Sequence, residues 1–212
     1  MGEGQSLLAL AVVKEALHEC ILPGCGKKFP FDKIKKHEDT CQWRRVRCPG
    51  GSTCNRVVPF CQVLTHFEEC NSCKLVEDYE GLLPLLRRVA ISKRHIDANV
   101  DIDDWQTLVL FFQGQDFFVR PIWRNGCFLC EVVMKGTKEE CQGFMAKVSV
   151  LDAESGQAML TTSFSPRPLA LDAEYEAGFC LSASKQALSD AWKYEAARNA
   201  CLFTFTLDIN KL

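Results

Sequence analysis

The sequence predicts a mainly β protein in which two small Cys3His units precede an antiparallel β-sandwich with one helix. Two observations support this fold class. Eight of the thirteen cysteines lie between residues 20 and 73, and the later part of the chain consists of short apolar segments separated by turn residues. With 212 residues the chain can form one large domain or two small ones, and the change in cysteine density indicates a boundary between them.

The composition is that of an ordinary globular protein, with 47% hydrophobic residues, 25% charged residues and a net charge of −2. This composition excludes a disordered tail or a collagen-like chain, and the near-neutral charge argues against bulk nucleic-acid binding. No apolar run approaches the roughly 18 residues of a membrane-spanning helix. The first residues also lack the basic region of a secretory signal. We therefore expect a cytoplasmic or nuclear protein without a membrane partner.

The cysteine-rich region contains an internal repeat. Its first unit has the pattern Cys-x4-Cys-x11-His-x3-Cys, and its second unit has Cys-x5-Cys-x11-His-x3-Cys. Three of the four positions recur at an offset of 29 residues, and chance rarely produces two units with one ligand order. The expected ligands are Cys20, Cys25, His37 and Cys41 in the first unit, and Cys48, Cys54, His66 and Cys70 in the second.

These ligand sets predict two structural zinc sites, with two Zn²⁺ ions per chain. Zinc takes four thiolate or imidazole ligands, and a closed set of four leaves no open position for catalysis. A His and a Cys four residues apart lie on one face of a helix, so each unit is expected to be a hairpin followed by a helix. The alternative of plain buried thiols is disfavoured because such short units bury too little apolar surface to fold without metal. Cys73 could replace Cys70, but we favour Cys70.

The rest of the chain predicts a two-sheet sandwich. Turn sequences such as Q-G-Q, R-N-G and E-S-G-Q separate its strand-like segments. Residues 184–198 place apolar residues at helical spacing behind Ser184, a suitable N-cap, and predict the one helix. Residues 74–93 are expected to form a connector with a short helical piece. The expected strands are 107–112, 116–123, 127–135, 144–152, 158–164, 178–183 and 201–209, preceded by an edge strand at 95–103.

The predicted edge strand is also the candidate partner-binding site. It alternates apolar and polar residues, and an exposed strand edge can pair with an extended peptide. Its acidic face would favour a peptide that carries Lys or Arg. The alternative is that the apolar face packs on the core and Trp105 closes it. The candidate contact residues are Ile96, Ala98, Val100, Ile102 and Trp105, and the acidic face comprises Asp97, Asp101 and Asp103.

The sequence contains no catalytic constellation. Cys127 and Cys130 form a CxxC, but residues three apart on a strand face opposite sides, so we expect buried structural thiols. A nucleophile at Cys141 or Cys180 is a further alternative, although no histidine lies near either in sequence.

The tandem ligand pattern, together with the later motifs, resembles the seven-in-absentia (SIAH-type) family. The likeness covers residues 20–212: all eight ligand positions match over 20–70, and the β region shares D-D-W (103–105), F-F (117–118), V-M-K-G-T-K (133–138), F-x-A-K-V-S-V-L-D (144–152) and F-T-F-T-L-D-I (203–209). The resemblance implies a leader helix at 1–19, tandem SIAH-type zinc fingers at 20–73, a connector and edge strand at 74–103, and a TRAF-like β-sandwich at 104–212.

The resemblance also implies a function. Members of this family recruit substrates to a ubiquitin ligase through short extended degrons, and they dimerise through the β domain. Their RING domain needs further ligands upstream of Cys20, where this chain has only His18, so we expect a RING-less relative or a fragment of a longer one. The expected partners are protein substrates, a RING-containing or conjugating-enzyme partner, and a second copy of the chain. The alternatives are a nucleic-acid binder that uses Arg44, Arg45 and Arg47, or a non-degradative signalling adaptor.

Overall fold

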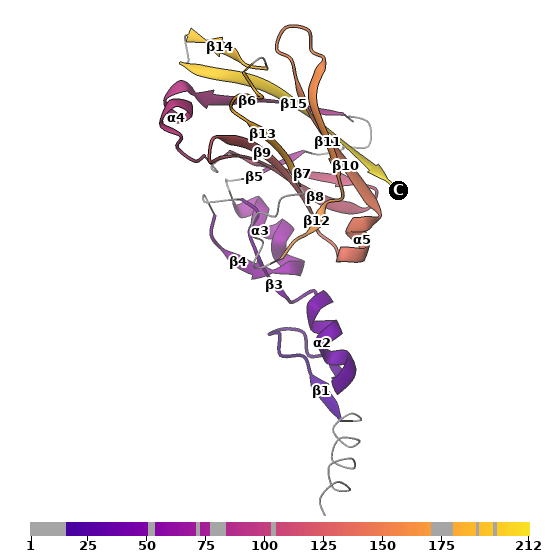
Figure 1. Ribbon diagram of the computed structural model, residues 1–212. Helices are drawn as coiled ribbons and strands as arrows, with labels where there is room; N and C mark the ends of the chain where they lie inside the picture. Colours follow the sequence, from indigo (N-terminus) through magenta and orange to yellow (C-terminus); the bar gives the residue numbers. More distant parts are fainter. Residues whose placement is uncertain are drawn as a thin grey trace, which may run out of the picture.

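The computed structural model describes residues 16–50, 54–70, 73–76, 84–102, 105–170, 180–189, 191–196 and 199–212. It confirms the predicted fold class, because the chain is mainly β, its sheets are largely antiparallel, and two Cys3His clusters precede the β domain. The first unit (residues 17–41) extends from the second unit (residues 45–70), which lies against the β domain (Figure 1).

Each unit is a short hairpin followed by a helix, as the ligand spacing predicted. The predicted leader helix does not reach its expected end, because 17–19 form a strand that pairs with 28–30; residues 1–15 lie outside the described part of the chain. The first unit contains β1 (Leu17–Glu19), β2 (Lys28–Pro30) and α2 (Phe31–Thr40), and the second contains β3 (Arg45–Arg47), β4 (Val57–Pro59), η2 (Phe60–Gln62) and α3 (Val63–Glu69).

One sheet of the sandwich is organised around the last strand, and we call it the C-terminal sheet. Its central strand β15 pairs with β6 along one edge, and with β14 and then β10 along the other; β11 pairs with the far side of β10. All these pairings are antiparallel. The strands are β6 (Leu85–Ser92), β10 (Phe144–Leu151), β11 (Ala158–Phe164), β14 (Lys193–Glu195) and β15 (Ala200–Lys211).

The other sheet, which we call the meander sheet, is built on three consecutive antiparallel strands, β7, β8 and β9. Both connecting turns have two consecutive residues with positive φ, Gln113–Gly114 and Asn125–Gly126, which suits tight hairpins. Two pairings are parallel, β5 with β7 and β12 with β9. The strands are β5 (Cys73–Val76), β7 (Thr107–Phe112), β8 (Gln115–Arg124), β9 (Cys127–Met134), β12 (Arg167–Pro168) and β13 (Cys180–Ser184).

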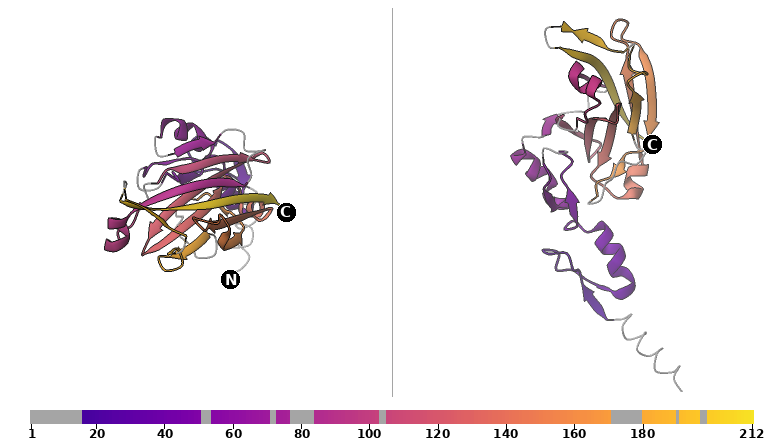
Figure 2. Two further views of the ribbon diagram at one scale, coloured as in Figure 1. Left: turned by 90° about the horizontal axis from the view of Figure 1, so that it is seen from above. Right: turned by 60° about the vertical axis from the view of Figure 1, so that its left-hand side comes forward.

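The main core fills the space between these two sheets, which pack face to face (Figure 2). Aromatic side chains dominate it. Phe128 of β9 contacts Phe203 and Phe205 of β15, with ring centroids 4.6 and 5.7 Å apart. A short helix, α5 (Lys138–Gln142), joins the sheets and begins with a capping box made by Thr137 and Glu140.

The predicted edge strand at 95–103 is wrong, because residues 93–98 form a helix, α4 (Lys93–Ala98). Ser92 caps its first turn by accepting the His95 N–H, and Asn99 ends it in the left-handed conformation with φ +52°. These local hydrogen bonds satisfy the backbone without a neighbouring strand. Among the described residues of this segment, 95–102, strand pairing is confined to Ile102, which forms an isolated bridge with Trp123.

Two further elements differ from the prediction. The expected connector at 74–93 contains β6, which pairs with β15 over eight residues and belongs to the sandwich. In place of the expected helix at 184–198, the described residues 184–189 and 191–196 form turns and β14. Ser184 Oγ does accept the Ala187 N–H, as an N-cap would, but pairing with β15 takes up the following residues. None of the described helices is long and apolar enough to cross a membrane.

Candidate metal centres

The structure brings the eight predicted ligands together as two separate clusters. In each cluster the three sulfur atoms and the histidine nitrogen lie within 4.8 Å of one another. The members are Cys20, Cys25, His37 and Cys41 in the first cluster, and Cys48, Cys54, His66 and Cys70 in the second. Each donor set can therefore hold one metal ion.

The first cluster forms where the β1–β2 hairpin meets the end of α2. Backbone hydrogen bonds shape the hairpin, since the Cys20 N–H donates to Lys27 O at 2.8 Å and the Cys25 N–H donates to Leu22 O at 3.1 Å. The helix supplies His37, whose Nε2 lies 3.3 Å from the Cys25 Sγ. Phe29 stacks on the His37 ring at 4.1 Å and fixes its orientation.

The second cluster repeats this geometry between the β3–β4 hairpin and α3. The Cys48 N–H donates to Arg56 O at 2.9 Å, and the Gly50 N–H donates to the Cys48 Sγ at 3.3 Å. The Cys54 Sγ lies 3.2 Å from His66 Nε2. Donation from a backbone N–H stabilises a thiolate ligand, as does the matching bond from the Trp43 N–H to Cys41 Sγ in the first cluster.

The electrostatics of both clusters call for a cation. Burial raises the pKa of the Cys54 thiol to about 11, and the adjacent Cys70 and Cys48 side chains add to the rise. Burial likewise raises the pKa of Cys20 to about 11, with contributions from Cys25 and Cys41. Several thiolates cannot gather in so small a space without a positive charge between them. A divalent ion with a preference for sulfur and imidazole supplies that charge.

The two clusters have different surroundings. The second unit packs against the outer face of the meander sheet, where Phe67 of α3 meets Phe118 of β8 with ring centroids 5.1 Å apart. The Thr107 hydroxyl donates to Pro49 O at 2.8 Å, in a buried hydrogen bond across the same interface. The apolar residues buried at this interface are Val46, Val63, Phe67, Val109, Phe118, Val133 and Leu169. Sequence reasoning missed this docking.

A buried ion-pair network lies on the same outer face and was also missed. Glu131 of β9 is 4% exposed and pairs with two arginines, Arg120 of β8 and Arg167 of β12. The Arg120 Nη1 lies 3.8 Å from the carboxylate. Arg120 and Glu131 are direct cross-strand neighbours, which the alternation of these strands could have indicated once their register was known.

The predicted partner-binding residues do not share one face. Ile96 is buried in the core on α4, whereas Val100 is 45% exposed and Ala98 is exposed. Trp105 is half-buried against Phe128, with ring centroids 6.2 Å apart, and Ile102 packs beside the core. The face expected from the strand prediction therefore does not form, because the first residues turn into a helix.

The two cysteines weighed as nucleophiles, Cys141 and Cys180, are both buried. Burial raises the pKa of the Cys141 thiol to about 12, and burial also raises the pKa of Cys130 strongly. Cys180 is buried, and the two histidines outside the clusters, His18 and His95, contact an aromatic ring and a serine hydroxyl instead. Cys127 and Cys130 are both free thiols; Cys130 is buried, as expected, whereas Cys127 is only partly buried.

The predicted nucleic-acid arginines have unequal roles. Arg44 lies over the Phe60 ring, with its guanidinium carbon 3.4 Å from the centroid, and donates to the Cys41 carbonyl at 3.2 Å. Arg45 and Arg47 are exposed on β3, on either side of the buried Val46. Arg44 therefore stabilises the fold, and only Arg45 and Arg47 of the three predicted arginines are exposed for contact with a nucleic acid.

The sequence matches no protein-family model and no curated protein. The geometry of the two clusters and of the β domain is therefore the basis for a functional proposal.

Proposed function

We propose that each cluster binds one Zn²⁺ ion in a closed structural site, which gives two ions per chain. The donor set of three sulfurs and one imidazole nitrogen supports this choice, since tetrahedral Cys3His sites are typical of structural zinc. Both clusters also sit in units too small to fold on apolar burial alone. Metal binding is then part of their folding free energy.

From these sites we infer a function in protein recognition: the chain is a substrate-recognition and scaffold module of a SIAH-like ubiquitin-ligase system. The observation that carries this proposal is the tandem arrangement of two Cys3His clusters followed by an antiparallel β-sandwich, with the second cluster docked on a sheet. The family resemblance of the ligand pattern supports the link to ubiquitin. A RING-containing or conjugating-enzyme partner would supply the transfer activity.

The edge of β6 is the best candidate for the partner peptide. Among the described residues, β6 pairs with β15 alone, so its other edge offers unpaired N–H and C=O groups to an extended chain. Leu86, 62% exposed, and the exposed Ala90 stand on its outer face and could contact alternate side chains of the peptide. This assignment replaces the strand expected at 95–103.

A comparison of two variants tests the function. Leu86→Asp with Ala90→Asp should abolish partner capture in cells, whereas Lys147→Asp on the outer face of β10 should leave it intact. Proteins captured by the wild type alone should also turn over more slowly when the variant replaces it, and proteasome inhibition should remove that difference. Captured partners with unchanged half-lives would favour a non-degradative adaptor and overturn the ubiquitin proposal.

Dimerisation through the β domain remains part of this proposal. Among the aromatic residues of β7 and β8, Phe117, Phe118 and Trp123 are buried, whereas Phe111 is 51% exposed and available for a two-fold contact. Light scattering should detect a species of twice the 23.9 kDa chain mass at tens of micromolar. A species of one chain mass at that concentration would contradict it.

A further inference from the structure

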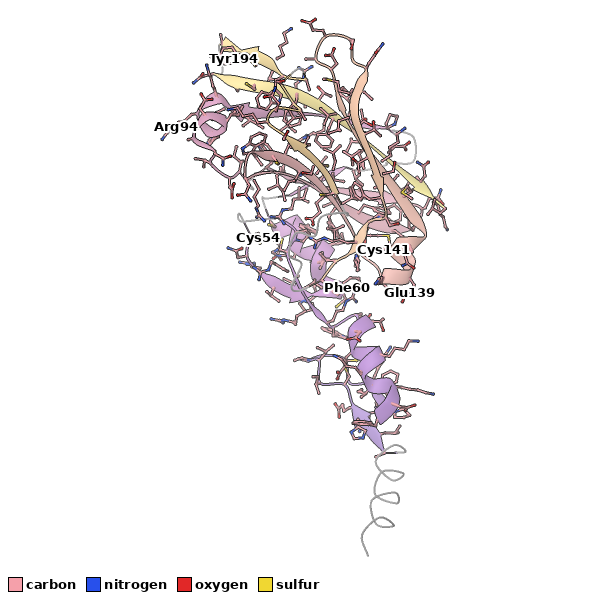
Figure 3. The ribbon with its side chains drawn as sticks, in the orientation of Figure 1. Cys54, Phe60, Arg94, Glu139, Cys141 and Tyr194 are labelled. Carbon is pink, nitrogen blue, oxygen red and sulfur yellow. The ribbon has the colours of Figure 1, made fainter. Side chains whose placement is uncertain are left out.

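A charged cleft separates the first unit from the β domain. Its volume is about 770 Å³, within the range of about 300–1,000 Å³ typical of ligand-binding clefts. One wall comes from the C-terminal half of α2 and the start of β3, and the other from the residues around the start of α5 and the end of β12. Phe60 of the second unit and Glu139 of the β domain both lie on the side of the molecule from which the first unit extends (Figure 3).

Arg44 ties the first wall of the cleft to the second unit. Its guanidinium donates to the carbonyl oxygens of Thr40 and Cys41 at the end of α2, and the same group stacks on Phe60 of the second unit. Lys135 of the β domain lies over the same ring at 5.6 Å and pairs with Asp116 at 3.6 Å. A continuous set of contacts thus runs from a metal ligand of the first unit to the meander sheet.

Backbone hydrogen bonds reinforce this joint. The Phe60 N–H donates to Arg44 O at 2.9 Å, and the Cys61 N–H donates to Gln42 O at 2.8 Å. The link between the units is therefore tied to the second unit rather than free to swivel. Because the walls are fixed in this way, the cleft is preformed, and a ligand need not order it on binding.

Within the described part of the chain, the cationic side chains in the cleft mostly lack partners, whereas most of its acidic side chains have one. Lys36, Arg45 and Lys138 line it as exposed cations without an ion pair or side-chain hydrogen bond among the described residues. Its acidic side chains are mostly engaged: Asp39 pairs with Lys35 at 3.4 Å, and Glu38 accepts from the Ile21 N–H at 3.4 Å. Glu139 is the acid that stands free among the described lining residues.

We propose that this cleft binds an acidic, extended segment of a partner protein. The lining carries four cations (Lys36, Arg44, Arg45 and Lys138) against three acids (Glu38, Asp39 and Glu139), and Lys35, which pairs with Asp39, adds a fifth cation. The resulting excess of two positive charges complements an acidic segment, and the contacts of Arg44 set the position of one of them. The site lies between the first unit and the β domain and is distinct from the β6 edge. Binding of an acidic segment at this cleft does not depend on a role of the chain in ubiquitin transfer.

Binding of a fluorescein-labelled hexaglutamate peptide to the zinc-loaded chain tests the proposal, with hexaglutamine as the uncharged probe. Fluorescence anisotropy should detect the acidic peptide at low salt, and its affinity should fall as salt rises. Arg45→Glu and Lys138→Glu should each weaken binding about tenfold. Lys33→Glu and Arg56→Glu make the same charge change at exposed positions outside the cleft, and each should weaken binding less than about twofold.

Two further variants separate position from net charge. Glu139→Gln should strengthen binding. Asp32→Asn makes an equal charge change on α2, outside the cleft, and should leave binding unchanged. Arg44→Lys keeps the charge but loses the stacked, forked geometry, so it should weaken binding several-fold. Metal content and thermal unfolding of every variant serve as the folding control. Absent wild-type binding at low salt, or equal losses in cleft and control variants, would overturn the proposal.

Discussion

The two Cys3His units share one ligand order but have different relations to the rest of the molecule. No residue of α2 is buried, whereas Val63 and Phe67 of α3 are buried against the meander sheet. At the 29-residue offset, Glu38 of the first unit corresponds to Phe67 of the second, and Lys35 corresponds to Leu64. Ligand residues thus decide whether a unit can hold metal, and the residues between them decide whether it docks.

The largest expected effect comes from loss of a second-site ligand. Cys54→Ser should remove one of two zinc ions and release α3 from the sheet, because metal binding contributes about 10–16 kcal/mol to the folding of such units. We expect the β domain to lose about 1.5–3 kcal/mol of stability for each large apolar side chain of its outer face that becomes exposed, such as Phe118 and Val133. Metal analysis and thermal unfolding measure both effects.

His37→Ala in the first unit is the matched control. It should also reduce the zinc content from two to one, while the unfolding midpoint of the β domain stays within a few degrees, since α2 does not pack on the sandwich. Equal shifts in the two variants would contradict the difference drawn between the units. A chelator should unfold both units before the β domain.

A deletion on the sheet side of the docking interface should have the next largest effect. Phe118→Ala removes a ring that is fully buried against Phe67, at an expected cost of about 3–5 kcal/mol. Phe111→Ala on the neighbouring strand, where the ring is 51% exposed, should cost less than about 1 kcal/mol. Urea unfolding of both variants measures the two losses of stability. Similar losses would mean that docking of the second unit contributes little to the stability of the β domain.

A glycine pair in the first hairpin should produce a smaller and local effect. A Cβ at Gly24 would lie 2.7 Å from the Trp43 ring, and the residue has φ +94°. Gly26 also has a positive φ, of +62°, but open space around it. Gly24→Ala should therefore destabilise the first site by about 1–3 kcal/mol more than Gly26→Ala. Competition with a zinc-binding dye measures this, and the β domain should keep its unfolding midpoint in both.

The smallest effect is expected at an exposed ion pair on α2. Lys35 and Asp39 lie 3.4 Å apart, with side chains 80% and 63% exposed. Lys35→Ala should change stability by less than about 0.5 kcal/mol, because solvent screens such pairs. Thermal unfolding and the zinc affinity of the first site measure this effect. A clear loss of either in Lys35→Ala would contradict the small contribution assigned to this ion pair.

Much of the fold could be predicted because the relevant signals are local. The ligand spacing fixes the two clusters through the geometry of a hairpin and one helical turn, independent of the rest of the chain. The strands from 107 to 164 were equally predictable, since their apolar segments end at turns such as Asn125–Gly126 that need positive φ.

The remaining elements depend on partners far away in sequence. Residues 184–198 have helical spacing, yet pairing with β15 draws Lys193–Glu195 into a strand. The apolar residues around Pro84 predict a connector with a short helical piece over 74–93, but pairing with β15 makes residues 85–92 a strand. The docking of Phe67 on Phe118 joins two segments that share no sequence signal, so neither the interface nor the cleft beside it could be derived before the fold was known.

The position of β15 has a consequence for the order in which the protein folds. Leu85 pairs with Leu207, so β6 emerges early during synthesis while its partner strand is among the last parts of the β domain to be made. Both Cys3His units, by contrast, close through contacts within short segments and can fold as soon as metal is available. Until β15 arrives, β6 presents two open edges to other chains, and such non-local pairing folds slowly. Newly made chains are therefore expected to depend on chaperone protection of β6, and aggregation should begin there when β15 is removed or weakened.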